Sequence, residues 1–193
     1  MAKFNLINTP INGLKLVEVS SSQDSRGFFM ETWNKHEFEK LGINVDFVQD
    51  NHSRSKKGVL RGLHFQAPYS QAKLVRCVRG AVFDVAVDLR QDSKTFCQWY
   101  GIILGDVDKK MFFIPENFAH GFLALTDNVD FLYKTSEYYH PEYDRGIIWN
   151  DPELNIAWPL DQFGINKAIV SEKDSKLLTL KDYLINADFN NRG

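Results

Sequence analysis

The chain has 193 residues, a formal net charge of -2 and an apolar content of 44%, which suffices for one domain with a sizeable core. The near-neutral charge weighs against nucleic-acid binding, which requires a basic field. No apolar run approaches the roughly 18 residues of a membrane span, and residues 1–10 lack a secretion-signal pattern. Cys77 and Cys97 lie in apolar, strand-like surroundings without CxxC spacing, which argues against a disulfide framework or a zinc cluster. A reducing compartment is therefore expected. The sequence predicts a cytoplasmic domain that binds neither nucleic acid nor membrane.

The predicted elements are mostly short strands separated by turn residues. In chain order, strands rich in Val, Ile, Phe, Tyr and Trp are expected at 13–19, 27–33, 82–89, 99–104, 111–114, 121–125 and 131–139. Within 82–89, apolar residues alternate with Asp84 and Asp88, which predicts one apolar face. Helices are expected only at 35–41 and near 172–184, with a loose tail after about residue 187. The pattern predicts a mainly β sandwich, barrel or jelly roll.

His64 is the first candidate for a general base, because it ends the predicted strand VLRGLHF. A histidine there can equally be a hydrogen-bonded core or rim residue. Arg61 would face the opposite side of a flat strand, so a shared pocket requires a bulge or bend at Gly62. The preceding amide, carboxylate, amide run at 49–51 has basic neighbours. Together these residues indicate a site for an anionic, hydroxylated ligand.

Several other polar residues each allow two interpretations. His120 is either a turn residue or part of a metal site, although the apolar neighbours of His64 disfavour a metal. Tyr133 is either a core aromatic or a proton donor. Tyr139 either covers a nucleobase or finishes a sheet edge. Lys73 either protects a strand edge or stabilises a developing enolate.

Three charged residues, Arg26, Glu31 and Asp174, are similarly open. Arg26 and Glu31 form either an exposed ion pair of little energetic weight or part of a binding site. Asp174 belongs to the first turn of the expected C-terminal helix, with Ser171 as its N-cap. Neither GxGxxG nor GxxxxGK[ST] occurs, so no dinucleotide or P-loop signature is present.

Five long segments carry a resemblance to a known family: DSRGFFMETW, FVQDNHSRSKKGVLRGLHFQ, KLVRCVRGAVFDVAVDLR, FFIPENFAHGFLAL and WNDPELNIAWP. From about residue 13 to 174, the chain closely resembles the dTDP-4-dehydrorhamnose 3,5-epimerase family. The resemblance implies a cupin-type jelly roll, or double-stranded β-helix, spanning residues 1–193. It also implies a homodimer whose N-terminal strands cross to the partner, and activity without metal or cofactor.

The resemblance assigns roles residue by residue. It implies that His64 is the catalytic base, Asp174 its paired carboxylate, Tyr133 the proton donor and Lys73 the cation at the carbonyl oxygen. The matching substrate-binding positions are Arg26, Glu31, Gln49, Asp50, Asn51, Arg61, His120, Tyr139, Asp144 and Lys173, with Tyr139 stacking on the base. Asp144 departs from the pattern, because Glu is expected there in many members.

The implied reaction inverts C3 and C5 of dTDP-4-dehydro-6-deoxy-D-glucose, giving dTDP-4-dehydro-L-rhamnose for dTDP-L-rhamnose or related deoxysugar biosynthesis. The diphosphate explains the arginines, since guanidinium groups bind phosphates bidentately. Four alternatives remain at this point. They are an epimerase inverting only C5 or only C3 of another nucleotide 4-keto sugar, a sugar 3,4-ketoisomerase, a non-catalytic nucleotide-sugar-binding cupin and a metal-dependent oxygenase.

Overall fold

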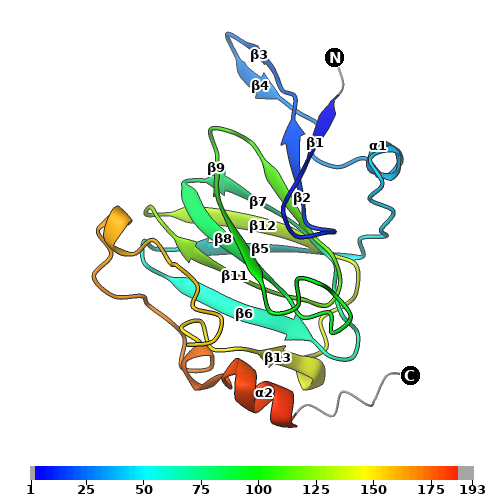
Figure 1. The fold of residues 1–193 in the computed structure, drawn as a ribbon. Coiled ribbons are helices and arrows are strands. Elements are labelled where there is room, and N and C mark those ends of the chain that lie inside the picture. The colour runs from blue at the N-terminus through cyan, green and yellow to red at the C-terminus, as the bar shows by residue number, and fades with distance from the viewer. Residues whose placement is uncertain (1–2, 187–193) are drawn as a thin grey trace.

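A computed structural model describes residues 3–186 and shows two antiparallel β-sheets packed face to face (Figure 1). The six-stranded sheet contains, in spatial order, β1 (Phe4–Asn8), β2 (Lys15–Val19), β10 (Met111–Ile114), β7 (Lys73–Arg79), β12 (Val129–Thr135) and β5 (Gln49–Ser55). The five-stranded sheet contains β13 (Asp144–Gly146), β6 (Leu60–Gln66), β11 (Phe118–Ala124), β8 (Ala81–Asp88) and β9 (Trp99–Gly105). Most spatial neighbours, such as β7 with β12 and β6 with β11, come from distant parts of the chain, which confirms the predicted cupin-type jelly roll.

A two-stranded hairpin of β3 (Ser22–Asp24) and β4 (Gly27–Phe29) projects away from both sheets (Figure 1). The predicted strand 27–33 therefore ends early. Two aromatic side chains of the hairpin, Phe28 and Phe29, are exposed by 57% and 77%. Such exposure is unusual for phenylalanine, and it marks the hairpin as a candidate contact surface.

Short helices flank the sheets, and the first agrees with the prediction. Helix α1 spans Lys35–Lys40 and is capped by Asn34, whose side chain accepts a hydrogen bond from the Glu37 N–H. Single 3₁₀ turns occur at η1 (Pro141–Tyr143), η2 (Asp161–Phe163) and η3 (Asp174–Lys176), and helix α2 spans Leu180–Asn186. None of the helices within residues 3–186 is long and apolar enough to cross a membrane.

The helix expected near 172–184 is divided into η3 and α2. The chain is extended at Leu177, and Leu178 then forms a parallel bridge with Ile147, with the Ile148 N–H donating to the Leu178 carbonyl over 2.8 Å. Pairing with the sheet thus interrupts the helix. The tail expected after about residue 187 lies outside the described residues.

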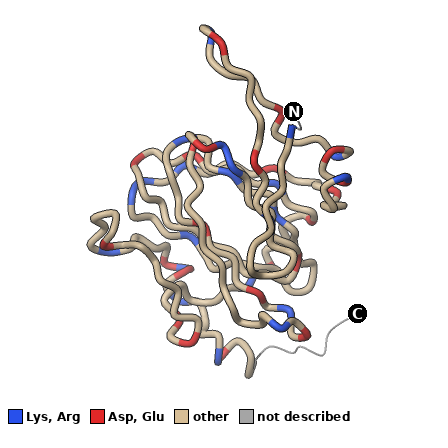
Figure 2. Tube along the Cα trace, turned by 45° about the horizontal axis from the view of Figure 1, so that its top comes forward, with Lys and Arg blue, Asp and Glu red and all other residues tan. Residues whose placement is uncertain are grey.

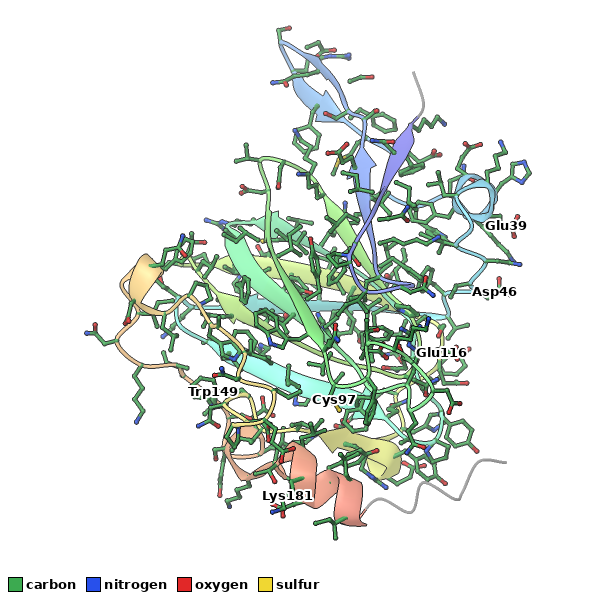
Figure 3. The ribbon with its side chains drawn as sticks, viewed as in Figure 1. Glu39, Asp46, Cys97, Glu116, Trp149 and Lys181 are labelled. Atoms are coloured by element: carbon green, nitrogen blue, oxygen red, sulfur yellow. The ribbon has the colours of Figure 1, made fainter. Side chains whose placement is uncertain are left out.

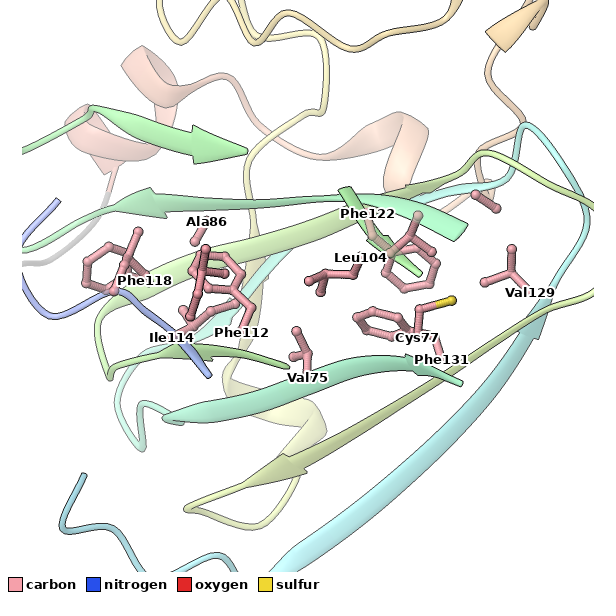
Figure 4. Packing of buried hydrophobic residues seen from close by; sticks show 14 of the residues in the cluster. Val75, Cys77, Ala86, Leu104, Phe112, Ile114, Phe118, Phe122, Val129 and Phe131 are labelled. Atoms are coloured by element: carbon pink, nitrogen blue, oxygen red, sulfur yellow. The ribbon is translucent and has the colours of Figure 1, made fainter. Parts of the chain in front are cut away.

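The main core fills the space between the sheets (Figure 4). Val75, Phe112 and Phe131 from the six-stranded sheet pack with Ala86 and Phe122 from the other. Apolar residues on both inner faces therefore hold the two sheets together.

Strand β8 corrects one expectation, because both of its faces are buried. Phe83, Val85 and Val87 contact an outer apolar cluster as predicted, yet Asp84 and Asp88 on the opposite face are fully buried. The prediction of a single apolar face was therefore wrong.

Charged residues of both signs are interspersed along the chain (Figure 2). Examples on exposed parts of the structure are Glu39, Asp46, Glu116 and Lys181 (Figure 3).

Strand β12 also ends earlier than expected, at Thr135 instead of Tyr139. The backbone N–H groups of Tyr138 and Tyr139 donate to the side chains of Glu137 and Gln49, at 2.7 and 3.0 Å. Side-chain oxygens here accept the hydrogen bonds that carbonyl groups of a neighbouring strand would accept in a sheet. The segment therefore leaves the strand and forms a loop.

The expected irregularity at Gly62 is present. On β11, His120 pairs with His64 and Phe122 with Arg61, so β6 contains one extra residue, as in a β-bulge. Gly62 has φ 119°, and a Cβ atom there would lie 2.5 Å from the Gly121 Cα. Only glycine tolerates this conformation and this approach. The bulge turns Arg61 and His64 toward the same side of the sheet.

We predict that Gly62→Ala destabilises the protein by at least roughly 4 kcal/mol, because it combines backbone strain with a backbone clash. Gly27→Ala is the matched control, since Gly27 has φ 127° but a Cβ atom there would have nothing within 4 Å, and we expect it to cost about 1–3 kcal/mol. Denaturant unfolding of both variants measures the difference. Equal losses would show that the approach to Gly121 carries no cost.

Candidate active site

A cavity of about 590 Å³ lies between the two sheets. It receives side chains from β5, β6, β7, β11 and β12 and from the segments 139–144 and 169–174. Its polar lining consists of Ser53, Arg61, His64, Gln66, Gln71, Lys73, His120, Tyr133, Tyr139, Asp144, Ser171, Lys173 and Asp174. The fold thus gathers all four predicted catalytic residues, and five of the ten predicted binding residues, in one cavity.

His64 and Asp174 form a hydrogen-bonded pair, with 2.8 Å between His64 Nε2 and Asp174 Oδ1. The side chain of His64 is 36% exposed and that of Asp174 only 5%. Since an ionised carboxylate only accepts hydrogen bonds, Nε2 carries the proton. The other ring nitrogen, Nδ1, is then free to take a proton from a ligand in the cavity.

Asp174 is held in place by two further hydrogen bonds. Its second oxygen accepts from the Gly62 N–H at 3.3 Å, and its own N–H donates to Ser171 Oγ at 3.0 Å. Burial raises the pKa of the Asp174 carboxyl, but hydrogen bonds from His64, Gly62 and Ser171 outweigh burial, and the net pKa is lowered. The sequence predicts Ser171 as the N-cap of a helix, but the element that forms is the 3₁₀ turn η3, whose N-cap position is Lys173.

Tyr133 and Lys73 come from the opposite sheet, on β12 and β7. Tyr133 follows Phe131 on the inner face of its strand, as predicted, and burial raises the pKa of its phenol. Lys73 is 6% exposed, and burial lowers its pKa to about 8. The cavity therefore has the His64 imidazole on one wall, and the Tyr133 phenol and the Lys73 ammonium group on the other.

Asp144 organises the mouth of the cavity. It accepts hydrogen bonds from the Tyr139 hydroxyl at 2.9 Å and from the Lys173 ammonium group. Hydrogen bonding to Asp144 raises the pKa of both Tyr139 and Lys173. Tyr139 remains half exposed, so its ring is accessible to a flat ligand group. The shorter Asp side chain thus contacts both Tyr139 and Lys173.

Arg26 and Glu31 do not reach this cavity. Arg26 bonds Asp24 within the projecting hairpin at 2.6 Å, and its side chain is 89% exposed. Glu31 bonds Lys3 and Asn34 instead. The ion pair between Arg26 and Glu31 considered from the sequence is therefore absent from the described structure, and both side chains lie outside the cavity of their own chain.

The run 49–51 lies on edge strand β5 beside the cavity and not in its lining. Gln49 bonds Asn51 at 2.9 Å and accepts from the Tyr139 N–H, which supports the loop that carries Tyr139. Asp50 points to the other face of the strand and pairs with Lys134 at 2.8 Å. Gln49 and Asn51 share their face with Ser53, which does line the cavity.

Known proteins match this chain along nearly its whole length. The family model described as dTDP-4-dehydrorhamnose 3,5-epimerase matches residues 8–182. A protein of that name from Methanothermobacter thermautotrophicus is 51% identical over 182 residues, covering 94% of this chain and 97% of its own. The chain belongs to the dTDP-4-dehydrorhamnose 3,5-epimerase family.

Solved structures of related epimerases support the same conclusion. The Legionella pneumophila enzyme, crystallised with dTDP-4-keto-L-rhamnose, has 49% identity and a TM-score of 0.88, covering 92% of this chain and 93% of its own. A 3'-monoepimerase from Streptomyces bikiniensis, crystallised with dTDP-quinovose, has 31% identity and a TM-score of 0.84, covering 92% and 88%. These two related structures are named for different numbers of inverted carbons, one as a 3,5-epimerase and the other as a 3'-monoepimerase.

Four polar residues around the site were not assigned to it from the sequence. Gln66 and Gln71 donate to the carbonyls of 137 and 138, and so hold the loop before Tyr139. Ser53 Oγ is buried in the wall of the cavity without a hydrogen-bond partner in residues 3–186. Asp84 lies behind His120 and bonds its Nε2. Only long-range pairing brings these side chains to the site.

His120 lies within strand β11 and is buried, so the interpretation as a turn residue was wrong. Residues 3–186 contain no group of three His, Cys, Asp or Glu side chains that could hold a metal ion.

Cys77 and Cys97 are both unpaired thiols, and burial raises the pKa of each to about 11.

Lys73 provides a test of the site through protein stability. Between pH 8 and its unperturbed pKa of 10.5, the unfolded chain binds more protons at Lys73 than the folded one, so stability rises with pH. Below pH 8 the fold carries the full cost of a buried charge. We predict that Lys73→Met stabilises the protein at pH 7 by roughly 1–3 kcal/mol, with a smaller gain at about pH 9.5.

Denaturant unfolding at the two pH values measures this effect, with the exposed Lys57→Met as control for loss of a surface charge. A Lys73→Met protein that is less stable than wild type at pH 7 would contradict the assignment of Lys73 as a destabilising buried cation.

Proposed function

We propose that the protein inverts C3 and C5 of dTDP-4-dehydro-6-deoxy-D-glucose to form dTDP-4-dehydro-L-rhamnose, in dTDP-L-rhamnose or related deoxysugar biosynthesis. The observation that carries the proposal is the His64–Asp174 pair, which faces Tyr133 and Lys73 across one cavity. The names of the relatives agree with it. Two unpaired thiols support a reducing, cytoplasmic location.

The reaction requires removal of a proton from a carbon next to a ketone. His64 takes this proton through Nδ1, and Asp174 orients the ring and stabilises its positive charge. The electron pair moves onto the carbonyl oxygen, forming an enolate, and the Lys73 ammonium group stabilises that oxyanion. Each acid–base role contributes about 10²–10⁴ in rate, and an oxyanion contact about 10²–10³. No redox change occurs, so the step needs no electron carrier.

Inversion follows if the proton returns to the opposite face of the sugar. Tyr133 extends from the sheet opposite His64, so its phenol donates a proton to that face. Return of a proton from His64 would instead regenerate the original configuration. Opposed walls are therefore the geometric requirement for epimerisation, and the jelly roll meets it by forming the cavity between two sheets.

The remaining residues bind other parts of the substrate or support the loop at the mouth of the cavity. Tyr139, at the mouth, stacks on the thymine ring, while Lys173 and Arg61 provide positive charge for the diphosphate. His120 binds the substrate in the cavity. Gln49 and Asn51 support the loop at the mouth. Asp50, on the outer face of β5, pairs with Lys134 and lies outside the lining of this cavity.

We further propose a homodimer in which the projecting hairpin of each chain completes the partner's cavity. Arg26 and Glu31 do not line the cavity of their own chain, and the exposed Phe28 and Phe29 supply apolar surface for the contact. An isologous dimer would place the two hairpins symmetrically. This arrangement explains why Arg26 and Glu31, which belong to the family motifs, lie outside the cavity that other motif residues of the same chain line.

The proposed reaction is tested by proton NMR of the 4-keto substrate in D₂O, scoring deuterium at C3 and C5 separately. We predict that wild type exchanges and inverts both centres, and that His64→Asn abolishes both processes while dTDP affinity stays within a few-fold of wild type. Tyr133→Phe is expected to exchange at C5 faster than it inverts, because His64 still forms the enolate and returns a proton to the same face.

Other patterns of deuterium exchange would assign a different function to the protein or a different role to Tyr133. Exchange at one centre only would make the protein a single-centre epimerase, as the Streptomyces bikiniensis relative is named. Equal loss of exchange and inversion in Tyr133→Phe would assign Tyr133 to enolate stabilisation or binding. Tight nucleotide-sugar binding without exchange would identify a non-catalytic binding protein.

Mixed dimers test the shared cavity. Arg26→Ala and His64→Ala proteins are each expected to be inactive. After joint unfolding and reassembly, half of the dimers are mixed and each has one intact cavity, so about a quarter of the sites should recover. Mixing the folded proteins without unfolding is the control. No recovery despite heterodimers shown by mass spectrometry would mean that each cavity is built from one chain.

A further inference from the structure

Asp84 is a carboxylate placed where an apolar side chain would be expected. It lies on the inner face of β8 between Val82 and Ala86, and all three residues are fully buried. Both neighbours belong to the main apolar cluster. A buried carboxylate generally lowers stability compared with an apolar residue of similar volume. Asp84 therefore calls for an explanation other than core packing.

The hydrogen bonds of Asp84 all lead to one residue. Within residues 3–186, both carboxylate oxygens bond His120 Nε2, each at 3.0 Å, and no other donor is seen on them. The ring of His120 also stacks on Phe131 at an interplanar angle of 18°. The carboxylate and the aromatic ring together fix both the position and the rotation of the imidazole.

His120 reaches the cavity directly beside the proposed base. Strands β11 and β6 place His120 opposite His64 in their ladder, and paired residues of neighbouring strands point to the same side of a sheet. Both side chains line the cavity. Each ring bonds a buried carboxylate through Nε2, Asp174 for His64 and Asp84 for His120, which leaves Nδ1 of each ring for a ligand.

We propose that Asp84 is a positioning residue, which holds His120 by Nε2 so that Nδ1 bonds an oxygen of the hexose beside the carbon that His64 deprotonates. The inference rests on the proposed function, because it needs a hexose in the cavity. Burial raises the pKa of the Asp84 carboxyl, in keeping with an acid that has few partners. Through His120, Asp84 controls how the ring of the substrate lies against the base.

The test uses Asp84→Asn, which keeps the shape of the side chain. We expect kcat for exchange at C3 and C5 to fall roughly 10- to 100-fold, because a misplaced contact costs that much, while dTDP affinity changes less than about threefold. The free energy of unfolding should stay the same or rise. Asp130→Asn is the control, since Asp130 is also buried and bonds a histidine, His52, outside the cavity.

A double-mutant cycle separates positioning from a purely structural role. In a His120→Gln background, Asp84→Asn should reduce kcat by less than about threefold, because its only route to the substrate is gone. Multiplicative losses in the two backgrounds, or wild-type kcat in Asp84→Asn, would overturn the proposal. So would an equal fall in kcat for Asp130→Asn.

A measurement without substrate keeps the inference testable if variants fold poorly or the proposed reaction fails. Imidazole ¹H–¹⁵N correlation spectra of the wild type, assigned by loss of the His120 signals in His120→Gln, should show a proton on Nε2. A neutral His120 ring with its proton only on Nδ1 would overturn the pairing. Absence of epimerisation together with the Nε2 proton would refute the proposed function and the hexose contact, but not the fixed ring.

Discussion

The close approach of two glycine backbones is the constraint on which the site depends. A Cβ atom at Gly62 would lie 2.5 Å from the Gly121 Cα, and one at Gly121 would lie 2.7 Å from the Arg61 carbonyl oxygen. Without side chains at both positions, β6 accommodates one extra residue while remaining paired with β11. The bulge brings Arg61 and His64 to one side, and it presents the Gly62 N–H to Asp174.

Two charged groups at the site, Lys73 and Asp84, are disfavoured by burial, whereas hydrogen bonds offset the burial of Asp174. Lys73 is a cation buried among strands, and Asp84 and Asp174 are carboxylates with almost no exposure. Buried charges cost more than apolar residues of the same volume unless they are well paired. Each carboxylate bonds a histidine that faces the cavity, and Lys73 faces the same space. The rigid sheets maintain this costly arrangement.

The two ends of the cavity are built differently. Its interior is formed by strands, whose regular hydrogen bonding fixes His64, Tyr133 and Lys73 relative to one another. Its mouth is formed by loops, and their polar side chains hold Tyr139 and Lys173 around Asp144. Proton transfer needs well-defined geometry, whereas stacking tolerates small shifts. This division fits a reaction at the sugar with affinity supplied largely by the nucleotide.

The sequence by itself determined the mainly β class, the alternation in β8 and β12 and the residues of the long family motifs, because strand periodicity and local motifs are encoded by neighbours in the chain. It also located the irregularity at Gly62 from the spacing of Arg61 and His64. Tertiary structure decided that both faces of β8 are buried, that pairing at Leu178 divides the C-terminal helix, and that Asp84 stands behind His120. These features depend on contacts between residues 30 or more positions apart in the chain, and such contacts leave no local pattern in the sequence.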